Sequence, residues 1–209
     1  MTDGISAVSV QDGGASGNEG ERLDVASGSL LIIDQFMLAN RQFLIRLDQS
    51  SQTNHSGLSE KIERAVVDYG GCIVHLENGT YRLFRDPYQA LIVLYPAHSS
   101  VASAAPDEDF GWVFERRAEF VPIGRVWVDT RCMVFVDSHQ LQNQTLLSEY
   151  SALRQSRRDK PARDLLRASG AAVRYGFNRY GDELGVFRLG NEGIIALWPD
   201  VTSEGKAPG

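Results

Sequence analysis

The fold is decided by a stretch that occurs in two versions along the chain. Val25–Asn40 reads VASGSLLIIDQFMLAN, and Val128–Asn143 reads VDTRCMVFVDSHQLQN. Aligned without a gap at an offset of 103 residues, the two versions share four identical residues and keep the chemical character of five more. In both, a short apolar run ends in an aspartate, which is the pattern of a strand buried on both faces and followed by a turn.

A second pair of stretches aligns in the same register. Tyr81–Pro96 matches Leu184–Pro199 at the same offset, which brings the total to nine identities in 32 aligned positions. Roughly two identities would be expected from average composition. We therefore predict a tandem internal duplication, in which the two halves share one architecture.

Each half is predicted to contain one strand, a helix and three further strands. Apolar residues at helical spacing indicate a helix that ends at Gly70 in the first half and at Gly170 in the second, because glycine suits a left-handed stop. An extra helix is predicted over 145–154, and further strand over 110–120 and 125–136. The predicted fold class is α+β and β-rich, with strand–helix–three strands formed twice around a pseudo-two-fold axis.

The composition is that of an ordinary globular protein, with 209 residues of which 43% are hydrophobic and 23% charged. Residues 1–22 and 202–209 are too poor in apolar side chains to form a core, so we predict that both are disordered. Between them lie a first repeat over 23–96, a low-complexity linker over 97–109 and a second repeat over 110–201. One half would bury only a marginal core, so the two repeats are expected to form a single globular unit.

Charge and compartment exclude some classes of protein. The formal net charge of −6 lies mainly in the N-terminal tail, since residues 1–24 contain five acidic residues and one basic residue. No apolar run matches a secretory signal or is long enough to cross a bilayer. The two cysteines lie in strand-like runs, where a free thiol behaves as a buried hydrophobe. We therefore expect a cytoplasmic protein without a membrane partner.

The most informative candidate pair is Asp34 and Asp137, because the alignment places them at equivalent positions. If the pseudo-two-fold axis brought them together, the two carboxylates would share a proton or hold a divalent cation. The simpler interpretation is that each aspartate caps the turn after its strand. His139 follows Asp137 closely, but Phe36 stands at the equivalent place in the first half, so we expect a surface or turn role for the histidine.

Basic residues supply two further candidates. Arg85 and Arg188 repeat in a Phe-Arg dipeptide and are a candidate anion-binding pair, with a polar strand face as the simpler interpretation. The segment 154–174 contains seven basic and two acidic residues, which keeps nucleic-acid binding open as an alternative to a solvated helical face. The candidate basic patch consists of Arg154, Arg157, Arg158, Lys160, Arg163 and Arg167.

The sequence contains no short motif of a nucleotide-binding, hydrolytic or redox site. We assign no catalytic residue, no metal ligand and no cofactor. The prediction is a non-catalytic binding or assembly module that acts on a protein or small-molecule partner through a sheet surface or the groove between its halves. A metal-dependent hydrolase that uses Asp34 and Asp137 stays open as an alternative, and nucleic acid is not the expected partner. An isologous homodimer is compatible with such a module.

One stretch resembles known families. The strand opening Val-x-Ser-Gly-x-Leu-x-Ile-x-Asp over Val25–Asp34, followed by short glycine-punctuated hairpins that end in Ile-x-Leu, resembles uncharacterised bacterial families described as domains of unknown function. In the second version of the stretch, Arg131 replaces the glycine of this pattern. The resemblance implies no activity and no functional residue.

Overall fold

The computed structural model describes residues 20–51, 60–86, 88–97, 110–130, 132–175 and 182–199. The strands of the first half are β1 (Glu21–Val25), β2 (Ser29–Asp34), β3 (Cys72–His75), β4 (Gly79–Asp86) and β5 (Leu91–Pro96). Those of the second half are β6 (Phe120–Val128), β7 (Cys132–Asp137), β8 (Ala172–Tyr175), β9 (Asp182–Leu189) and β10 (Ile194–Pro199). The α-helices are α1 (Gln35–Ala39), α2 (Arg41–Ser51), α3 (Glu60–Asp68), α5 (Gly111–Glu115), α6 (Gln144–Gln155) and α7 (Asp159–Ala168), and the 3-10 turns are η1 (Arg117–Glu119), η2 (Ser138–Gln142) and η3 (Gly190–Glu192).

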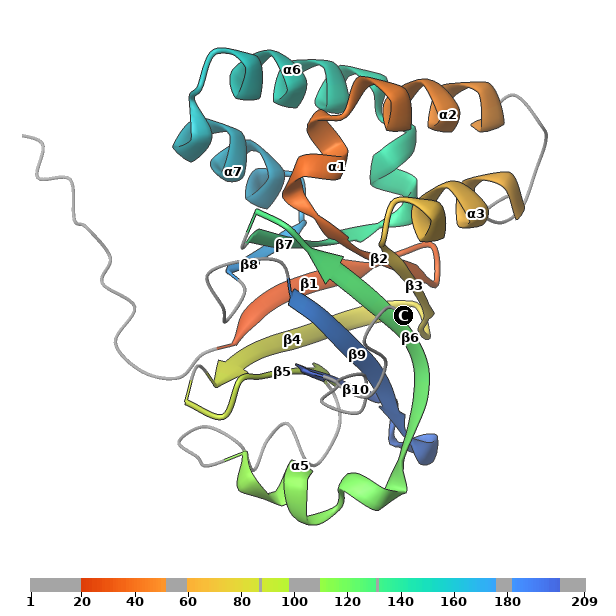
Figure 1. Ribbon diagram of the computed structural model, residues 1–209, viewed down its shortest axis with the longest axis vertical. Coiled ribbons are helices and arrows are strands. Elements are labelled where there is room, and N and C mark those ends of the chain that lie inside the picture. Colours follow the sequence, from red (N-terminus) through yellow and green to blue (C-terminus); the bar gives the residue numbers. More distant parts are fainter. Residues whose placement is uncertain are drawn as a thin grey trace, which may run out of the picture.

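The strands form two antiparallel sheets that pack face to face (Figure 1). The smaller sheet has the order β3-β2-β7-β8, and the larger has the order β1-β4-β5-β10-β9-β6. Helices α1, α2, α3, α6 and α7 lie on the outer side of the four-stranded sheet, and α5 lies on the far side of the six-stranded sheet (Figure 1). The expectation of a β-rich α+β fold is thereby confirmed.

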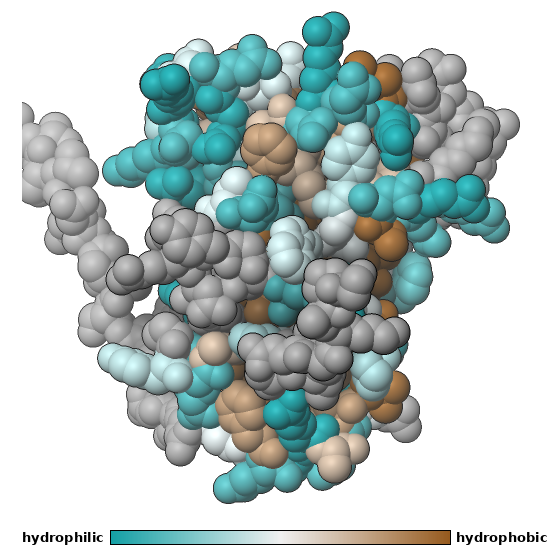
Figure 2. Space-filling view, in the orientation of Figure 1, coloured by the Kyte–Doolittle hydropathy of each residue, from teal (hydrophilic) through white to brown (hydrophobic). Residues whose placement is uncertain are grey.

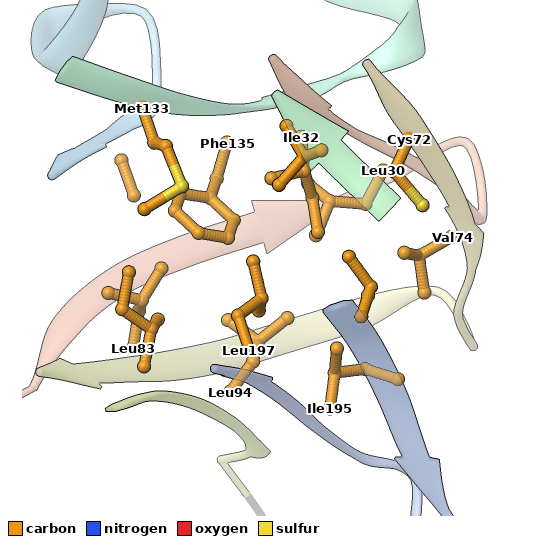
Figure 3. Close-up of a cluster of buried hydrophobic side chains, with 14 of the residues drawn as sticks. Leu30, Ile32, Cys72, Val74, Leu83, Leu94, Met133, Phe135, Ile195 and Leu197 are labelled. Atoms are coloured by element: carbon orange, nitrogen blue, oxygen red, sulfur yellow. The ribbon is translucent and has the colours of Figure 1, made fainter. Parts of the chain in front are cut away.

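Three layers of buried apolar side chains hold these elements together. The first lies between the sheets, where Phe135 and Ile32 point from the smaller sheet toward Leu83 and Leu197 of the larger one (Figure 3). The second lies between the smaller sheet and the helices, and the third lies under α5. The central strands of each sheet are therefore buried on both faces, which explains why β2 and β7 are continuous apolar runs.

The same succession of elements occurs in residues 21–96 and 120–199. In each, a two-stranded opening leads through helical segments to three further strands. Both sheet orders read the same from either edge, because β2 pairs with β7 at the centre of one sheet and β5 pairs with β10 at the centre of the other. The helix stops at Gly70 and Gly170 have φ angles of 84° and 94°, as a glycine stop requires.

Several expectations need correction. Glu21 and Arg22, predicted to belong to a disordered tail, form the start of β1, which pairs with β4. The charged side chains of this strand make it look like part of a disordered tail in the sequence. The segment 35–51 forms two helices that the sequence reading omitted. The strand predicted over 110–120 is wrong except at Phe120, where β6 begins. The residues before it form α5 and η1, because their aromatic side chains pack against the outer face of the six-stranded sheet.

Other expectations fall outside the described part of the chain. Residues 1–19 of the predicted tail, residues 98–109 of the predicted linker and the predicted C-terminal tail over 202–209 lie outside the described residues. Within the described ranges, no helix combines the length and apolar character that crossing a bilayer requires.

Candidate binding site

The structure places Asp34 and Asp137 at opposite ends of the β2–β7 pair. Asp34 lies opposite Met133, and Asp137 lies opposite Leu30. Four ladder positions separate the two aspartates, which is about 13 Å along an antiparallel strand. A shared proton or a bridged cation requires carboxylate oxygens within a few ångströms of one another. The two aspartates therefore occupy two separate sites.

Each aspartate binds the turn that connects the two sheets in the other half. Asp34 accepts hydrogen bonds from the N–H groups of residues 129–130 in the β6–β7 turn, at 2.6 and 2.8 Å. Asp137 accepts from the N–H groups of residues 26–27 in the β1–β2 turn, at 2.5 and 3.0 Å. Each also accepts from the N–H two residues ahead, at 2.6 and 2.9 Å, and so caps the helical turn that follows its own strand. These contacts join the halves reciprocally.

Asp137 is fully buried and stays ionised. Burial raises the pKa of this carboxyl, but hydrogen bonds from Ser27 and His139 outweigh burial and hold the pKa below its ordinary value of 3.8. His139 Nδ1 lies 2.6 Å from the Asp137 carboxylate, while more than half of the imidazole is exposed. The charge of Asp137 is thus committed to the turn contacts that join the halves.

The two arginines of the Phe-Arg repeats do not form one site. Arg85 lies on β4 and Arg188 on β9, and β5 and β10 stand between these strands. Three strand spacings correspond to about 14 Å. Arg188 donates a hydrogen bond to the backbone carbonyl of His75 at the end of β3.

Acidic side chains pair with much of the basic segment. Arg154 pairs with Asp159 at 2.5 Å, and Arg167 lies 3.4 Å from Glu21 of β1. Three basic residues of the candidate patch lie at the turn between α6 and α7 and are exposed, namely Arg157, Arg158 and Lys160. The basic patch therefore divides between ion pairs and a solvated turn.

The sheets meet along two topologically equivalent edges, which we call seams. In the open seam, α3 and β3 face β6, and in the closed seam, α7 and β8 face β1. The strand registers show the equivalence. Glu21 of β1 pairs with Leu83, and Gly124 of β6 pairs with Val186, where Leu83 and Val186 in turn pair with Leu94 and Leu197 at the sheet centre. Glu21 and Gly124 therefore occupy the same place in the two seams.

The open seam contains a pocket of about 460 Å³. Its walls come from α3, from β3 with the loop before it, and from β6 with a contribution from β9. On the right of the view in Figure 2, where α3 and β6 lie, hydrophobic side chains reach the surface between hydrophilic ones. The pocket is lined by Glu63, Val67, Gly70, Gly71, Cys72, Ile73, His75, Ile123, Gly124, Arg125, Trp127 and Glu183.

A glycine lets the two walls of this pocket pack against each other. A Cβ at Gly124 would lie 2.4 Å from the Cys72 sulfur, so only glycine lets β6 approach β3 this closely. At one end of the pocket, the backbone N–H of Trp127 donates a hydrogen bond to the Gly70 carbonyl at 2.7 Å and joins the two walls. His75 and Ile123 also line the pocket, beyond Cys72 and Gly124 along β3 and β6.

Few charged groups line the pocket, and they lie at its rim. Arg125 pairs with Glu183 at 3.2 Å. Glu63, half-buried in the first turn of α3, makes no ion pair with another residue in the described part of the chain. Burial raises the pKa of the Cys72 thiol to about 11, so the thiol stays protonated near neutral pH and is a poor nucleophile. The pocket is therefore an apolar site with one uncompensated carboxylate.

The closed seam is filled by a charged network. Glu21 lies 3.1 Å from the Arg174 guanidinium and 3.4 Å from that of Arg167. The Val173 N–H donates to the Glu21 carboxylate at 3.2 Å, and Arg174 donates to the Leu83 carbonyl at 3.2 Å. Side chains thus occupy the space that is empty in the open seam.

None of the residues that line the pocket is among the candidate site residues predicted from the sequence. A signal was available, because the alignment of the halves pairs Gly124 with Glu21 at the offset of 103 and Val67 with Arg167 at the offset of 100. In the described residues, no three His, Cys, Asp or Glu side chains gather as a metal site would require. The molecule is an α+β protein of two packed antiparallel sheets, with an apolar pocket at a sheet seam. Comparison with protein-family models, curated proteins and solved structures finds no match to this chain.

Proposed function

We propose that the protein is a non-catalytic binding module, formed by duplication of one half, that takes its ligand in the pocket of the open seam. The observation that carries this proposal is the contrast between the seams, since equivalent strands enclose a pocket in one and a charged network in the other. A concave site of several hundred cubic ångströms with apolar walls and a few polar groups is typical of ligand sites.

The duplication is supported by the topology as well as by the aligned stretches. Both sheet orders are symmetric, and equivalent strands keep equivalent registers. Asp34 and Asp137 make the same two kinds of contact, one to the following helical turn and one to the turn that connects the sheets in the other half. Two copies of one ancestral half packed around a pseudo-two-fold axis account for these regularities together.

The chemistry of the pocket favours binding over catalysis. The Cys72 thiol is protonated near neutral pH, and the Arg125 guanidinium pairs with Glu183. Both cysteines are free and buried, which suits a reducing compartment and supports a cytoplasmic location.

The test is a titration with indole, a neutral apolar probe, followed by ¹⁵N–¹H correlation spectra. We expect concentration-dependent shifts at Gly70, Ile73 and Trp127. Val67→Arg introduces the residue type that fills the closed seam, and we expect it to weaken indole binding at least about fivefold by occupying the pocket.

The matched control is Ile45→Arg, the same change at another exposed apolar position of a helix, on α2. This control should bind indole as the unmodified protein does. Shifts that cluster outside the open seam, or an equal effect of both substitutions, would overturn the proposal.

A further inference from the structure

We propose that the ligand of the open seam is an extended peptide segment of a partner protein, which adds as a short antiparallel strand to the edge of β3 at Ile73. This inference rests on the proposed function of the pocket. It follows from the direction of backbone groups on β3, from what binds the same groups in the closed seam, and from the side chains that surround Ile73.

The pairing of β3 with β2 fixes which backbone groups point outward. The Leu76 N–H donates to the Gly28 carbonyl at 2.9 Å, so this opposed pair is hydrogen-bonded. Hydrogen-bonded and non-hydrogen-bonded pairs alternate along an antiparallel ladder. The pair of Leu31 and Ile73 is therefore of the non-hydrogen-bonded kind. Both the N–H and the C=O of Ile73 consequently point away from β2, toward the pocket.

The neighbouring outward carbonyl supports this direction. His75 has the same parity as Ile73, and its carbonyl accepts a hydrogen bond from Arg188 of the other sheet. At the opposite end, the Gly70 carbonyl accepts from the Trp127 N–H. Contacts from the six-stranded sheet thus occupy both ends of the edge and leave the groups of Ile73 between them.

The closed seam shows what these outward groups bind. Val173 of β8 is the equivalent of Ile73, because it lies opposite Val134 as Ile73 lies opposite Leu31. The Val173 N–H donates to the Glu21 carboxylate at 3.2 Å, and its C=O accepts from Arg167 at 3.4 Å. One acceptor and one donor from side chains therefore complete this edge.

The open seam lacks both of those side chains. Gly124 stands in place of Glu21, and Val67 stands in place of Arg167. Among the described residues, the only hydrogen-bond contact found to the outward groups of Ile73 is the weak one from the Cys72 thiol to the Ile73 carbonyl, at 3.9 Å. A ligand must bring an acceptor and a donor at strand spacing. A single residue of an antiparallel strand brings both.

The surrounding side chains indicate which peptide fits. The Ile73 side chain packs with the helix-side core, so the peptide residue opposite it points toward α3, where Val67 and Glu63 line the pocket. A lysine or arginine there would lay its stem on Val67 and place its charge at Glu63. The residues on either side of it point toward Gly124 and the apolar floor. The expected motif is apolar–basic–apolar.

The probe is the peptide N-acetyl-Val-Leu-Lys-Leu-Val-amide. Its matched control is the same peptide with a methyl group on the backbone amide nitrogen of the lysine. We expect the first peptide to shift the Ile73 amide resonance and to slow its hydrogen exchange. The N-methylated peptide, which has lost the donor to the Ile73 carbonyl, should bind about tenfold more weakly. Glu63→Gln should reduce the preference for lysine over norleucine at the central position by about threefold.

The outcomes separate this inference from the function on which it rests. If indole binds in the pocket but the peptide leaves the Ile73 amide unchanged, the peptide inference is wrong and the binding function stands. If both peptides bind equally, pairing with β3 is wrong. If neither indole nor peptide binds, both proposals fail.

Discussion

The two seams of the molecule solve the same structural problem in opposite ways. Each must finish the exposed edge of a four-stranded sheet where a strand of the other sheet crosses it. In the closed seam, side chains bind the outward N–H and C=O groups of the edge strand. In the open seam, the N–H and C=O of Ile73 on β3 point into a pocket with apolar walls. The positions that differ are Glu21 against Gly124, Arg163 against Glu63, Arg167 against Val67, and Arg174 against Val74.

This difference teaches that the fold does not need a filled seam. A partly buried ion network must offset the cost of removing its charges from water, so replacing it with apolar residues is often neutral for stability. In the second solution, Glu63 and Val67 of α3 line a pocket instead of an ion network. These two side chains have no role in the core, which is why we propose that they contact a ligand in the open seam.

The comparison of the seams assumes that the same framework supports both. Substitution of Asp34 and Asp137, which join the two halves, is the strongest test of that assumption. We expect Asp34→Ala and Asp137→Ala each to lower the free energy of unfolding by about 3 kcal/mol, because two backbone N–H groups of a distant turn lose their acceptor. Urea denaturation followed by tryptophan fluorescence measures the change.

The control for this pair is His139→Ala, which removes a half-exposed imidazole from Asp137 and should cost less than about 1 kcal/mol. Equal losses for the two aspartates would support equivalent frameworks. A full loss at one aspartate with almost none at the other would show that the halves are held together asymmetrically.

The comparison of the seams can be sharpened by replacing charged residues of the closed seam with the kinds of residue found in the open seam. Glu21→Ala should destabilise the protein by about 2 kcal/mol, because it leaves Arg174 largely desolvated and the Val173 N–H without an acceptor. Adding Arg174→Val, the residue type that Val74 supplies in the open seam, should recover at least half of that loss. The same urea titrations test both variants, and a double variant no more stable than Glu21→Ala would contradict the idea that either solution suffices.

A smaller effect concerns pH. The pKa of Asp137 is lower in the folded protein than its ordinary value of 3.8, so the carboxylate stabilises the fold fully above about that pH. This part of the stability is lost as the pH falls through the lower, folded-state pKa. The urea midpoint should therefore drop more steeply below pH 4 for the unmodified protein than for Asp137→Asn, whose amide does not titrate. Parallel acid slopes for the two proteins would refute this assignment.

The sequence predicted well what depends on local signals. The β9–β10 hairpin at Gly190 follows from turn residues between apolar runs, and the glycine stops at Gly70 and Gly170 follow from helix-end chemistry. The dipeptide Asn78-Gly79 predicts a second hairpin, and this prediction is wrong, because β3 pairs with β2 and β4 pairs with β1 and β5 in the other sheet. The short strand β1 escaped because ERLDV alternates charged and apolar residues over only five positions, and its partner lies more than fifty residues away. The helices over 35–51 escaped although Asp34 and Asn40 cap them, because α1 has only five residues and a single residue separates it from α2.

The candidate site could not be reached by the same reasoning. The pocket depends on Gly124 lying against Cys72, a contact between residues far apart in the sequence that no spacing rule encodes. Identities between the aligned stretches mark the framework that the two halves share, and they drew attention to Asp34 and Asp137. The residues that we propose for binding are instead those at which the halves differ, and these differences can be interpreted only once the strand registers are known.

The reciprocal turn contacts also constrain the order in which the protein can assemble. Asp34 waits for N–H groups that lie 95 and 96 residues later in the chain, while Asp137 finds its partners already synthesised. During translation from the N-terminus, the Asp34 carboxylate therefore lacks these two donors until the turn between β6 and β7 has been synthesised. The reciprocal contacts that join the halves therefore form only after the chain has been synthesised through Asp137.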